Sequence, residues 1–319
     1  MSRERQQDHP DAVQDIYRRM TRAAGAETRY LTRPSGSRVH VIECGDGPPM
    51  VHLHGTLTSA LSHLMIAERM PGVRSYLVDR TGCGLSDPET YPRSGYRAHA
   101  LGFMNDVLDG LGVDETVLAG ASGGGIWATW YALARPERVR GLVLLGSVPT
   151  FPGGRAPLPL RLMATPVIGS VMRMKKPDRA MMLRIMETMG EGGSFCNHPD
   201  LLESLVAGAH DPVAEAANVA ELRAILNLAG IRGTMRIDPQ ALRGLTVPTL
   251  MIWGVRDPVV PVTQARVVAD LIPQSRLEEL DAGHVPQLRH PDAVASLMGA
   301  FAGIATRRGP AARSGPGTA

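Results

Sequence analysis

Short apolar runs alternate along this chain with longer segments of helical character, and this alternation restricts the fold more than any other feature. The apolar runs cover residues 37–44, 50–53, 73–78, 116–119, 139–145, 249–253 and 276–280. The helix-like segments cover residues 59–69, 97–111, 126–134, 263–271 and 291–301. Strands separated by helices pair in parallel, because the helix carries the chain back to the starting edge of the sheet. The sequence therefore predicts an α/β fold with a mostly parallel central sheet and helices on both faces.

The alternation stops between residues 147 and 238. This stretch begins with several prolines, continues with amphipathic runs such as "DRAMMLRIMETM", and holds eight of the sixteen methionines. We expect a helical subdomain inserted between two strands of the sheet. Methionine fills irregular gaps, so these residues fit either ordinary core packing or the lining of a flexible apolar pocket.

The same reading divides the chain into parts. We expect a polar N-terminal leader with a short helix at 1–27, and a core built from 28–146 together with 239–303. The helical subdomain is expected at 147–238. The segment 304–319 is rich in Gly, Pro, Ser and Arg, a composition typical of a disordered tail.

The charge balance argues against a nucleic-acid partner. The chain has 34 basic and 31 acidic residues, and three of the arginines, Arg307, Arg308 and Arg313, lie near the C-terminus. The rest of the chain is therefore close to neutral, whereas a nucleic-acid binder needs a basic face. A hydrophobic content of 44% is enough for a large core.

Cysteine spacing and hydropathy bear on location and metal content. Cys44, Cys83 and Cys196 are widely separated and lack the spacing of metal ligands, so we expect a reducing compartment and no structural zinc. No apolar run approaches the 18 or so residues of a membrane span. We expect a cytoplasmic protein with a small-molecule substrate and no membrane partner; a homodimer and a monomer both remain open.

One serine stands among four glycines in the stretch "TVLAGASGGGIWA", residues 116–128. A strand-like run precedes it and a buried, helix-like run follows. Each glycine inside an element costs about 1 kcal/mol relative to alanine, so this cluster indicates a turn too tight for side chains. The pattern G-x-S-x-G lacks the lysine of a P-loop and the spacing of a dinucleotide fingerprint. It predicts Ser122 as a nucleophile at a strand-to-helix turn, with an ordinary glycine-rich turn as the alternative.

A serine nucleophile needs a base, and a histidine base needs a carboxylate to orient it. Asp257 follows the apolar run 249–253, and His284 follows the run 276–280. The carboxyl ends of parallel strands share one edge of a sheet, so we expect Ser122, Asp257 and His284 to meet there.

The reaction of such a triad also needs donors for the oxyanion of the tetrahedral intermediate. The turn "HGTLTS" follows the apolar run 50–53. We expect the backbone N–H groups of Thr56 and of Gly123, the residue after the nucleophile, to form this oxyanion hole.

Five motifs in this order and spacing make the chain resemble the capped serine hydrolases of the α/β-hydrolase fold superfamily, over residues 28–303. The motifs are "HLHGTLTS", "DRTGCGLSD" at 79–87, "GASGGG", "WGVRDPVVP" and "AGHVPQLRHP". The resemblance implies a helical cap inserted after strand six, where the alternation stops, and the order Ser, Asp, His of the triad. It implies no cofactor and no metal.

Several neighbouring residues compete for these roles. Asp281 is the rival acid, although the context of Asp257 matches the acid loop of the superfamily. His54 is expected to bond to the backbone or pack on the sheet, and Asp79 to brace its turn through Arg80 or backbone amides. Cys83 is expected to be a small filler and not a reactive thiol.

The expected function is hydrolysis of a small to medium, largely apolar ester through an acyl-enzyme. Dehalogenases and epoxide hydrolases of this fold are excluded, because they need an aspartate where Ser122 stands. Hydrolases that cleave carbon–carbon bonds of ring-cleavage products are the alternative, although their oxyanion turn is richer in glycine. Perhydrolase chemistry as a side reaction and a non-catalytic, ligand-binding hydrolase scaffold also remain open.

Overall fold

The computed structural model describes residues 10–89, 91–92, 94–147 and 150–307. An eight-stranded sheet with the order β1-β2-β4-β3-β5-β6-β9-β10 forms its centre. The strands are β1 (Glu27–Thr32), β2 (Arg38–Cys44), β3 (Pro49–Leu53), β4 (Arg74–Val78), β5 (Thr116–Ala121), β6 (Val139–Leu145), β9 (Thr249–Gly254) and β10 (Ser275–Leu280). The pairs β1/β2 and β2/β4 are antiparallel, and the other five pairs are parallel. The predicted α/β fold with a mostly parallel sheet is confirmed.

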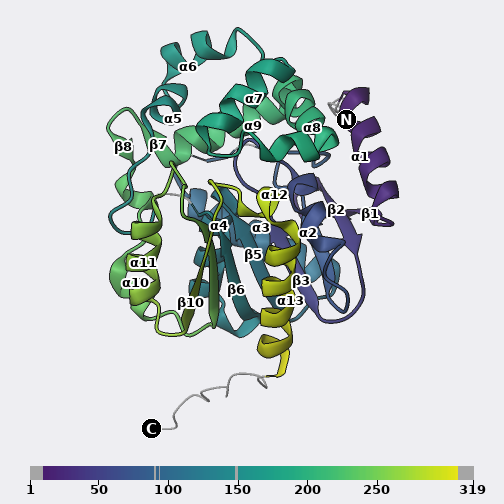
Figure 1. The fold of residues 1–319 in the computed structure, drawn as a ribbon, viewed down its shortest axis with the longest axis vertical. Coiled ribbons are helices and arrows are strands. Elements are labelled where there is room, and N and C mark those ends of the chain that lie inside the picture. The colour runs from purple at the N-terminus through teal and green to yellow at the C-terminus, as the bar shows by residue number, and fades with distance from the viewer. Residues whose placement is uncertain (1–9, 90, 93, 148–149, 308–319) are drawn as a thin grey trace.

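Helices cover both faces of this sheet (Figure 1). The core helices are α1 (Asp11–Ala23), α2 (Leu64–Ala67), α3 (Tyr96–Leu111), α4 (Gly123–Ala134), α10 (Pro239–Arg243), α11 (Val262–Leu271), α12 (Pro286–Arg289) and α13 (Pro291–Arg307), with 3₁₀ turns η1 (Ala60–His63) and η2 (Pro136–Arg138). Successive strand residues point to opposite faces. On β5, Leu118 joins the core under α3 and α4, whereas Val117 joins the core under α2 and α13. A strand buried on both faces must be apolar throughout, which is why β5 is a continuous apolar run.

Five of the six α-helices that the structure describes between β6 and β9 lie over one end of the sheet, at the top of Figure 1. We call them the cap helices: α5 (Leu158–Met163), α6 (Pro166–Arg173), α7 (Arg179–Thr188), α8 (Pro199–His210) and α9 (Pro212–Ile225). The same region contains the turns η3 (Ser194–Asn197) and η4 (Gly233–Met235) and a small hairpin of β7 (Leu226–Asn227) and β8 (Gly230–Ile231).

Three local features differ from the sequence-based expectation. Strand β1 was not expected; it is an edge strand with five of its six residues exposed, so it carries no apolar run. The segment 59–69 forms η1 and the short helix α2 instead of one helix. The boundary expected at residue 304 lies inside a helix, because α13 continues to Arg307. Ala305 is buried against the sheet beside Gly141. Residues 308–319 lie outside the described part of the chain.

Three histidines on and next to β3 are buried without an acidic partner. His52 and His63 stack edge to face with ring centroids 5.4 Å apart, and both ring nitrogens of His63 lack a hydrogen-bond partner in the described structure. Burial lowers the pKa of His52 to about 3, and it lowers the pKa of His63 as well. Burial, followed by the charge of Arg80, lowers the pKa of His54 to about 4. These rings are therefore neutral in the folded protein at neutral pH.

We expect mild acid to destabilise the protein through these histidines. Their folded-state pKa values lie below the unfolded value of 6.5, so the unfolded chain binds more protons as the pH falls from about 6.5 to about 4. The stabilisation is complete above pH 6.5 and is lost across this window, by roughly 3 kcal/mol for His54 alone. Urea unfolding at about pH 7 and about pH 5 measures the loss.

A matched pair of variants identifies the source of this pH dependence. His63→Met removes one buried titrating group and should flatten the dependence, whereas His210→Gln changes an exposed histidine and should leave it unchanged. Equal slopes in the wild type and in His63→Met would contradict the assignment.

Candidate active site

Ser122 stands in a strained turn between β5 and α4. Its backbone dihedrals are φ 46° and ψ −118°, a conformation that residues other than glycine rarely adopt. The turn is tight: a Cβ on Gly120 would lie 2.6 Å from the Gly124 oxygen, and a Cβ on Gly124 would lie 2.2 Å from the Leu53 oxygen. The glycines around Ser122 are therefore explained by close backbone contacts with α4 and β3.

Ser122, His284 and Asp257 form one hydrogen-bonded chain at the end of the sheet under the cap helices. The distance from His284 Nε2 to Ser122 Oγ is 3.1 Å, and that from His284 Nδ1 to Asp257 Oδ2 is 2.9 Å. The other carboxylate oxygen of Asp257 accepts the N–H groups of Val259 and Val260 at 2.8 and 2.9 Å. Asp257 and His284 are buried, while Ser122 is partly exposed. This is the geometry that a general base and its orienting carboxylate require.

The rival acid, Asp281, lies away from the histidine ring. Its carboxylate is exposed and pairs with the guanidinium of Arg256. Of the two candidate acids, Asp257 alone is hydrogen-bonded to His284.

The N–H groups of Thr56 and Gly123 adjoin each other beside Ser122. A Cβ on Gly123 would lie 3.1 Å from the Thr56 nitrogen. Within the described part of the chain, neither N–H donates to a protein acceptor. Two backbone donors that have no internal partner and lie next to a nucleophile can stabilise an oxyanion.

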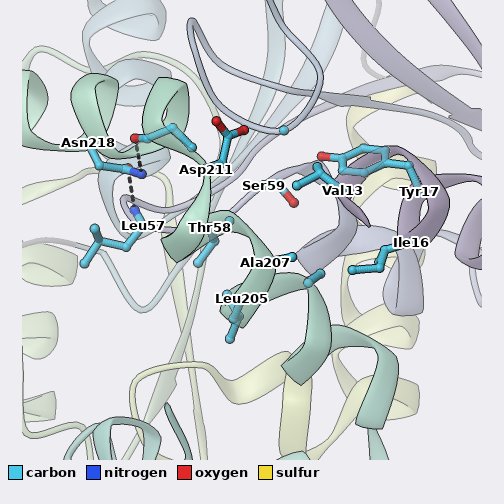
Figure 2. Close-up of a pocket in the computed structure, with 14 residues that line it drawn as sticks. Val13, Ile16, Tyr17, Leu57, Thr58, Ser59, Leu205, Ala207, Asp211 and Asn218 are labelled. Atoms are coloured by element: carbon cyan, nitrogen blue, oxygen red, sulfur yellow. Dashed lines mark hydrogen bonds between the residues drawn. The ribbon is translucent and has the colours of Figure 1, made fainter. Parts of the chain in front are cut away.

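Asn218, on the cap helix α9, bonds to the turn that carries Thr56. Leu57 adopts a left-handed conformation with φ 65°, and its N–H donates to Asn218 Oδ1 at 2.8 Å. The Asn218 amide nitrogen in turn donates to the Ala214 oxygen on the same helix. Figure 2 shows the bond between Asn218 and Leu57 at one side of a cavity of about 30 Å³ between α1, α8, α9 and residues 57–59. None of Ser122, Asp257 and His284 lines this cavity.

We expect Asn218→Ala to lower kcat roughly tenfold to a hundredfold with little change in KM, because a donor displaced by about 1 Å loses much of its effect on the transition state. Asn218→Asp keeps the acceptor oxygen and should retain more activity. Asn105→Ala removes an acceptor of the Tyr131 hydroxyl on the core helix α3 and serves as the control. Steady-state kinetics with an activated ester measures all three; wild-type kcat in Asn218→Ala would rule out this role.

A buried ion pair joins the cap to the core beside Gly123. Both terminal nitrogens of Arg80 bond to the Glu221 carboxylate on α9, and the Tyr96 hydroxyl donates to the same carboxylate at 2.7 Å. Burial opposes the charge on Glu221, but Arg80 lowers its pKa overall. The guanidinium also stacks 5.1 Å above the ring of Trp127. This buried cluster joins α9 to the core next to the turn that carries Ser122.

A second carboxylate of the cap, Glu191, holds the histidine loop. It is fully buried, accepts the Val285 N–H at 2.9 Å and accepts the hydroxyl of Ser194 at 3.0 Å. Burial raises the pKa of Glu191, although the hydrogen bond from Val285 counteracts part of that effect. The N–H of His284 donates to the Met189 oxygen in the same cap segment. No motif marks Glu191, Asn218 or Glu221, so their contacts with the site could not be predicted from the sequence.

The other candidates have structural contacts. His54 has Nδ1 2.8 Å from the Gly55 oxygen, and its Nε2 accepts the Arg80 N–H at 3.0 Å. Asp79 braces its turn through the backbone N–H groups of Ala60 and Leu85 and also bonds to Tyr17 and His40, but it does not bond to Arg80. Burial raises the pKa of Cys83 to about 12, so this thiol is not ionised at neutral pH.

Among the residues that the structure describes, no group of three or more His, Cys, Asp or Glu side chains is placed to hold a metal ion. None of the described helices combines the length and the hydrophobicity that crossing a bilayer requires.

The fold and this site define a class of proteins, and comparison with known sequences agrees. Residues 50–297 match the Alpha/beta hydrolase family. The chain belongs to this family and is a hydrolase.

Relatives within the family differ in the bond they cleave. The chain is 29% identical over 280 residues to a 2-hydroxymuconate semialdehyde hydrolase of Pseudomonas sp. (strain CF600), covering 84% of this chain and 91% of the relative. It is 29% identical over 270 residues to a pimeloyl-[acyl-carrier protein] methyl ester esterase of Yersinia pestis, covering 81% and 95%. A thermophilic esterase from Thermogutta terrifontis has the same fold, with a TM-score of 0.70, 22% identity and coverage of 88% of this chain and 99% of that one.

Proposed function

We propose that the protein hydrolyses a small to medium, largely apolar carboxylic ester through an acyl-enzyme. The observation that carries the proposal is the hydrogen-bonded chain from Asp257 through His284 to Ser122, next to two backbone N–H groups that have no acceptor in the described structure. This combination supplies a nucleophile, a base and a site for the oxyanion.

The geometry supports the following sequence of steps. Ser122 Oγ attacks the ester carbonyl carbon while His284 Nε2 accepts its proton, and the carbonyl oxygen becomes an oxyanion beside Thr56 and Gly123. The oxyanion re-forms the carbonyl, the alkoxide leaves, and His284 returns the proton to it. Water then attacks the acyl-enzyme with His284 again as the base, which releases the carboxylic acid and restores Ser122. Asp257 stabilises the imidazolium of His284 during both acylation and deacylation.

Two features support an apolar acyl group. The charged side chains of Arg80 and Glu221 lie beside the Ser122 turn but neutralise each other, and both terminal nitrogens of Arg80 bond to Glu221. The apolar runs of the cap carry few charges, many methionines and only Phe151 and Phe195 as aromatic residues. A neutral, adaptable surface favours apolar groups over charged ones.

Carbon–carbon bond hydrolysis is the second candidate. It is favoured by the similarity to the 2-hydroxymuconate semialdehyde hydrolase and to a 2-hydroxy-6-oxononadienedioate/2-hydroxy-6-oxononatrienedioate hydrolase of Cupriavidus pinatubonensis, 28% identical over 287 residues. The turn "HGTLTS" favours ester hydrolysis, because carbon–carbon bond hydrolases usually have more glycines in their oxyanion turn.

A substrate series separates these candidates. We expect kcat/KM to be measurable for p-nitrophenyl esters and to vary with acyl length, with a maximum at short or medium chains. Turnover of a vinylogous 1,5-diketone with no hydrolysis of any ester would transfer the assignment to the carbon–carbon hydrolase. No turnover of either class by a folded protein would favour the ligand-binding scaffold.

A further inference from the structure

Large apolar side chains are exposed together on one side of the cap helix α6. Val167, Val171 and Met174 have relative exposures of 75%, 62% and 81%, and Ile168 and Met172 beside them are also exposed. Residues spaced by four and then three positions lie on the same side of a helix. The opposite side is buried, because a Cβ on Gly169 would lie 2.2 Å from the Met163 oxygen of α5. Contiguous exposed apolar side chains indicate an interaction surface.

The segment of chain that carries these residues is rich in basic side chains. The chain from 154 to 177 contains five basic residues and no Asp or Glu; they are Arg155, Arg161, Arg173, Lys175 and Lys176. One acidic residue of another element, Glu215 on α9, pairs with Arg173 and Lys176. Arg155 and Lys175 are exposed. We call the exposed apolar residues of 167–174 and these five cations together the basic apolar face.

The basic apolar face lies where a broad, flat binding partner can reach it. Figure 1 shows α6 at the top of the cap helices, at the edge of the molecule farthest from the sheet. A broad surface can therefore approach α6 without meeting the core. Asn218 on α9 and Glu191 between α7 and η3, which both contact the candidate active site, lie in the same stretch of chain between β6 and β9 as α6.

We propose that the basic apolar face docks the protein on an anionic lipid surface. Side chains such as Val167, Val171 and Met174 enter the boundary between headgroups and acyl chains, while the surrounding lysines and arginines contact acidic headgroups. A second copy of this chain is a poorer match, because a symmetric contact would place the same cations against each other. The sequence predicts no membrane partner, because it has no apolar run long enough to span a bilayer. Docking at the membrane surface does not require such a run.

Vesicle flotation with the full chain tests the proposal. We expect the protein to float with vesicles of phosphatidylglycerol and phosphatidylcholine, to bind pure phosphatidylcholine at least tenfold more weakly, and to dissociate as salt is added. Arg155→Gln with Lys175→Gln should weaken binding about fivefold for each cation removed. Arg18→Gln with Arg276→Gln removes two exposed cations elsewhere and is the matched control.

The apolar part of the face has its own matched pair. Val167→Ser with Val171→Ser should weaken vesicle binding about tenfold or more, whereas Val267→Ser with Ile304→Ser, on α11 and α13, should have little effect. Val171→Trp supplies a reporter whose emission should shift to the blue on binding. Trp127, Trp130 and Trp253 are buried in the core, so their emission should not change. Hydrolysis of a soluble short-chain ester should be unchanged in all these variants, which separates this proposal from the proposed function.

Three results would overturn the proposal. The first is failure of the wild type to float with anionic vesicles at low salt. The second is equal binding by the wild type and both face variants. The third is a change of oligomeric state in the face variants, measured by sedimentation, without a change in vesicle binding; this result would assign the face to a second copy.

Discussion

Ser122→Ala is expected to lower kcat for ester hydrolysis on the order of 10⁶-fold while the protein remains folded, because the members of a triad act as one unit. Alanine keeps a side chain at the same strained dihedrals and removes only the nucleophilic oxygen. Ser122→Gly removes the oxygen and also the steric strain, so it should be equally inactive but more stable by about 1 kcal/mol. Steady-state kinetics and thermal melting separate these two effects.

Covalent labelling tests the same residue without a substrate. A fluorophosphonate should modify Ser122 once, because the serine oxygen attacks phosphorus only when His284 takes its proton. His284→Ala should slow the labelling by orders of magnitude. Ser86 and Ser147 are buried, and the Ser86 hydroxyl donates to the Asp79 backbone oxygen, so both serines should remain unmodified. A folded protein that gives no adduct, or an adduct on another serine, would remove the basis for a serine hydrolase.

Asp257→Asn is the second change with a large expected effect, a fall in kcat of about 10⁴-fold, as in a serine protease with the corresponding change. The neutral amide no longer stabilises the imidazolium, and it can hold His284 in the wrong tautomer. The fold should survive, because the remaining amide oxygen can still accept the N–H groups of Val259 and Val260. kcat measured across pH with one ester gives the comparison.

The matched control for this change is Asp281→Asn. Asp281 lies three residues before His284 but pairs with Arg256 at the surface, so kcat should stay within about twofold of the wild type. If Asp281→Asn is crippled and Asp257→Asn is active, the acid has been assigned to the wrong residue.

The fold class followed from local patterns, since strand and helix periodicity is carried by residues close in sequence. The two-sided burial of β5 makes its apolar run visible, and the contacts of Gly120 and Gly124 exclude any side chain at those positions. Edge strand β1 could not be predicted from an apolar run, because pairing with β2 holds it in the sheet while most of its side chains face solvent.

The sequence by itself determined which chemical groups the protein has at the ends of its strands: Ser122, Asp257 and His284, and the turn that carries Thr56. Only the tertiary structure decided which of two carboxylates lies against His284, and which residues of the cap hold the site. The bonds from the cap to the core join Leu57 to Asn218, Arg80 to Glu221 and Val285 to Glu191, across 161, 141 and 94 positions of the chain. Contacts over such separations depend on how the cap packs on the sheet, and no local pattern of residues encodes that packing.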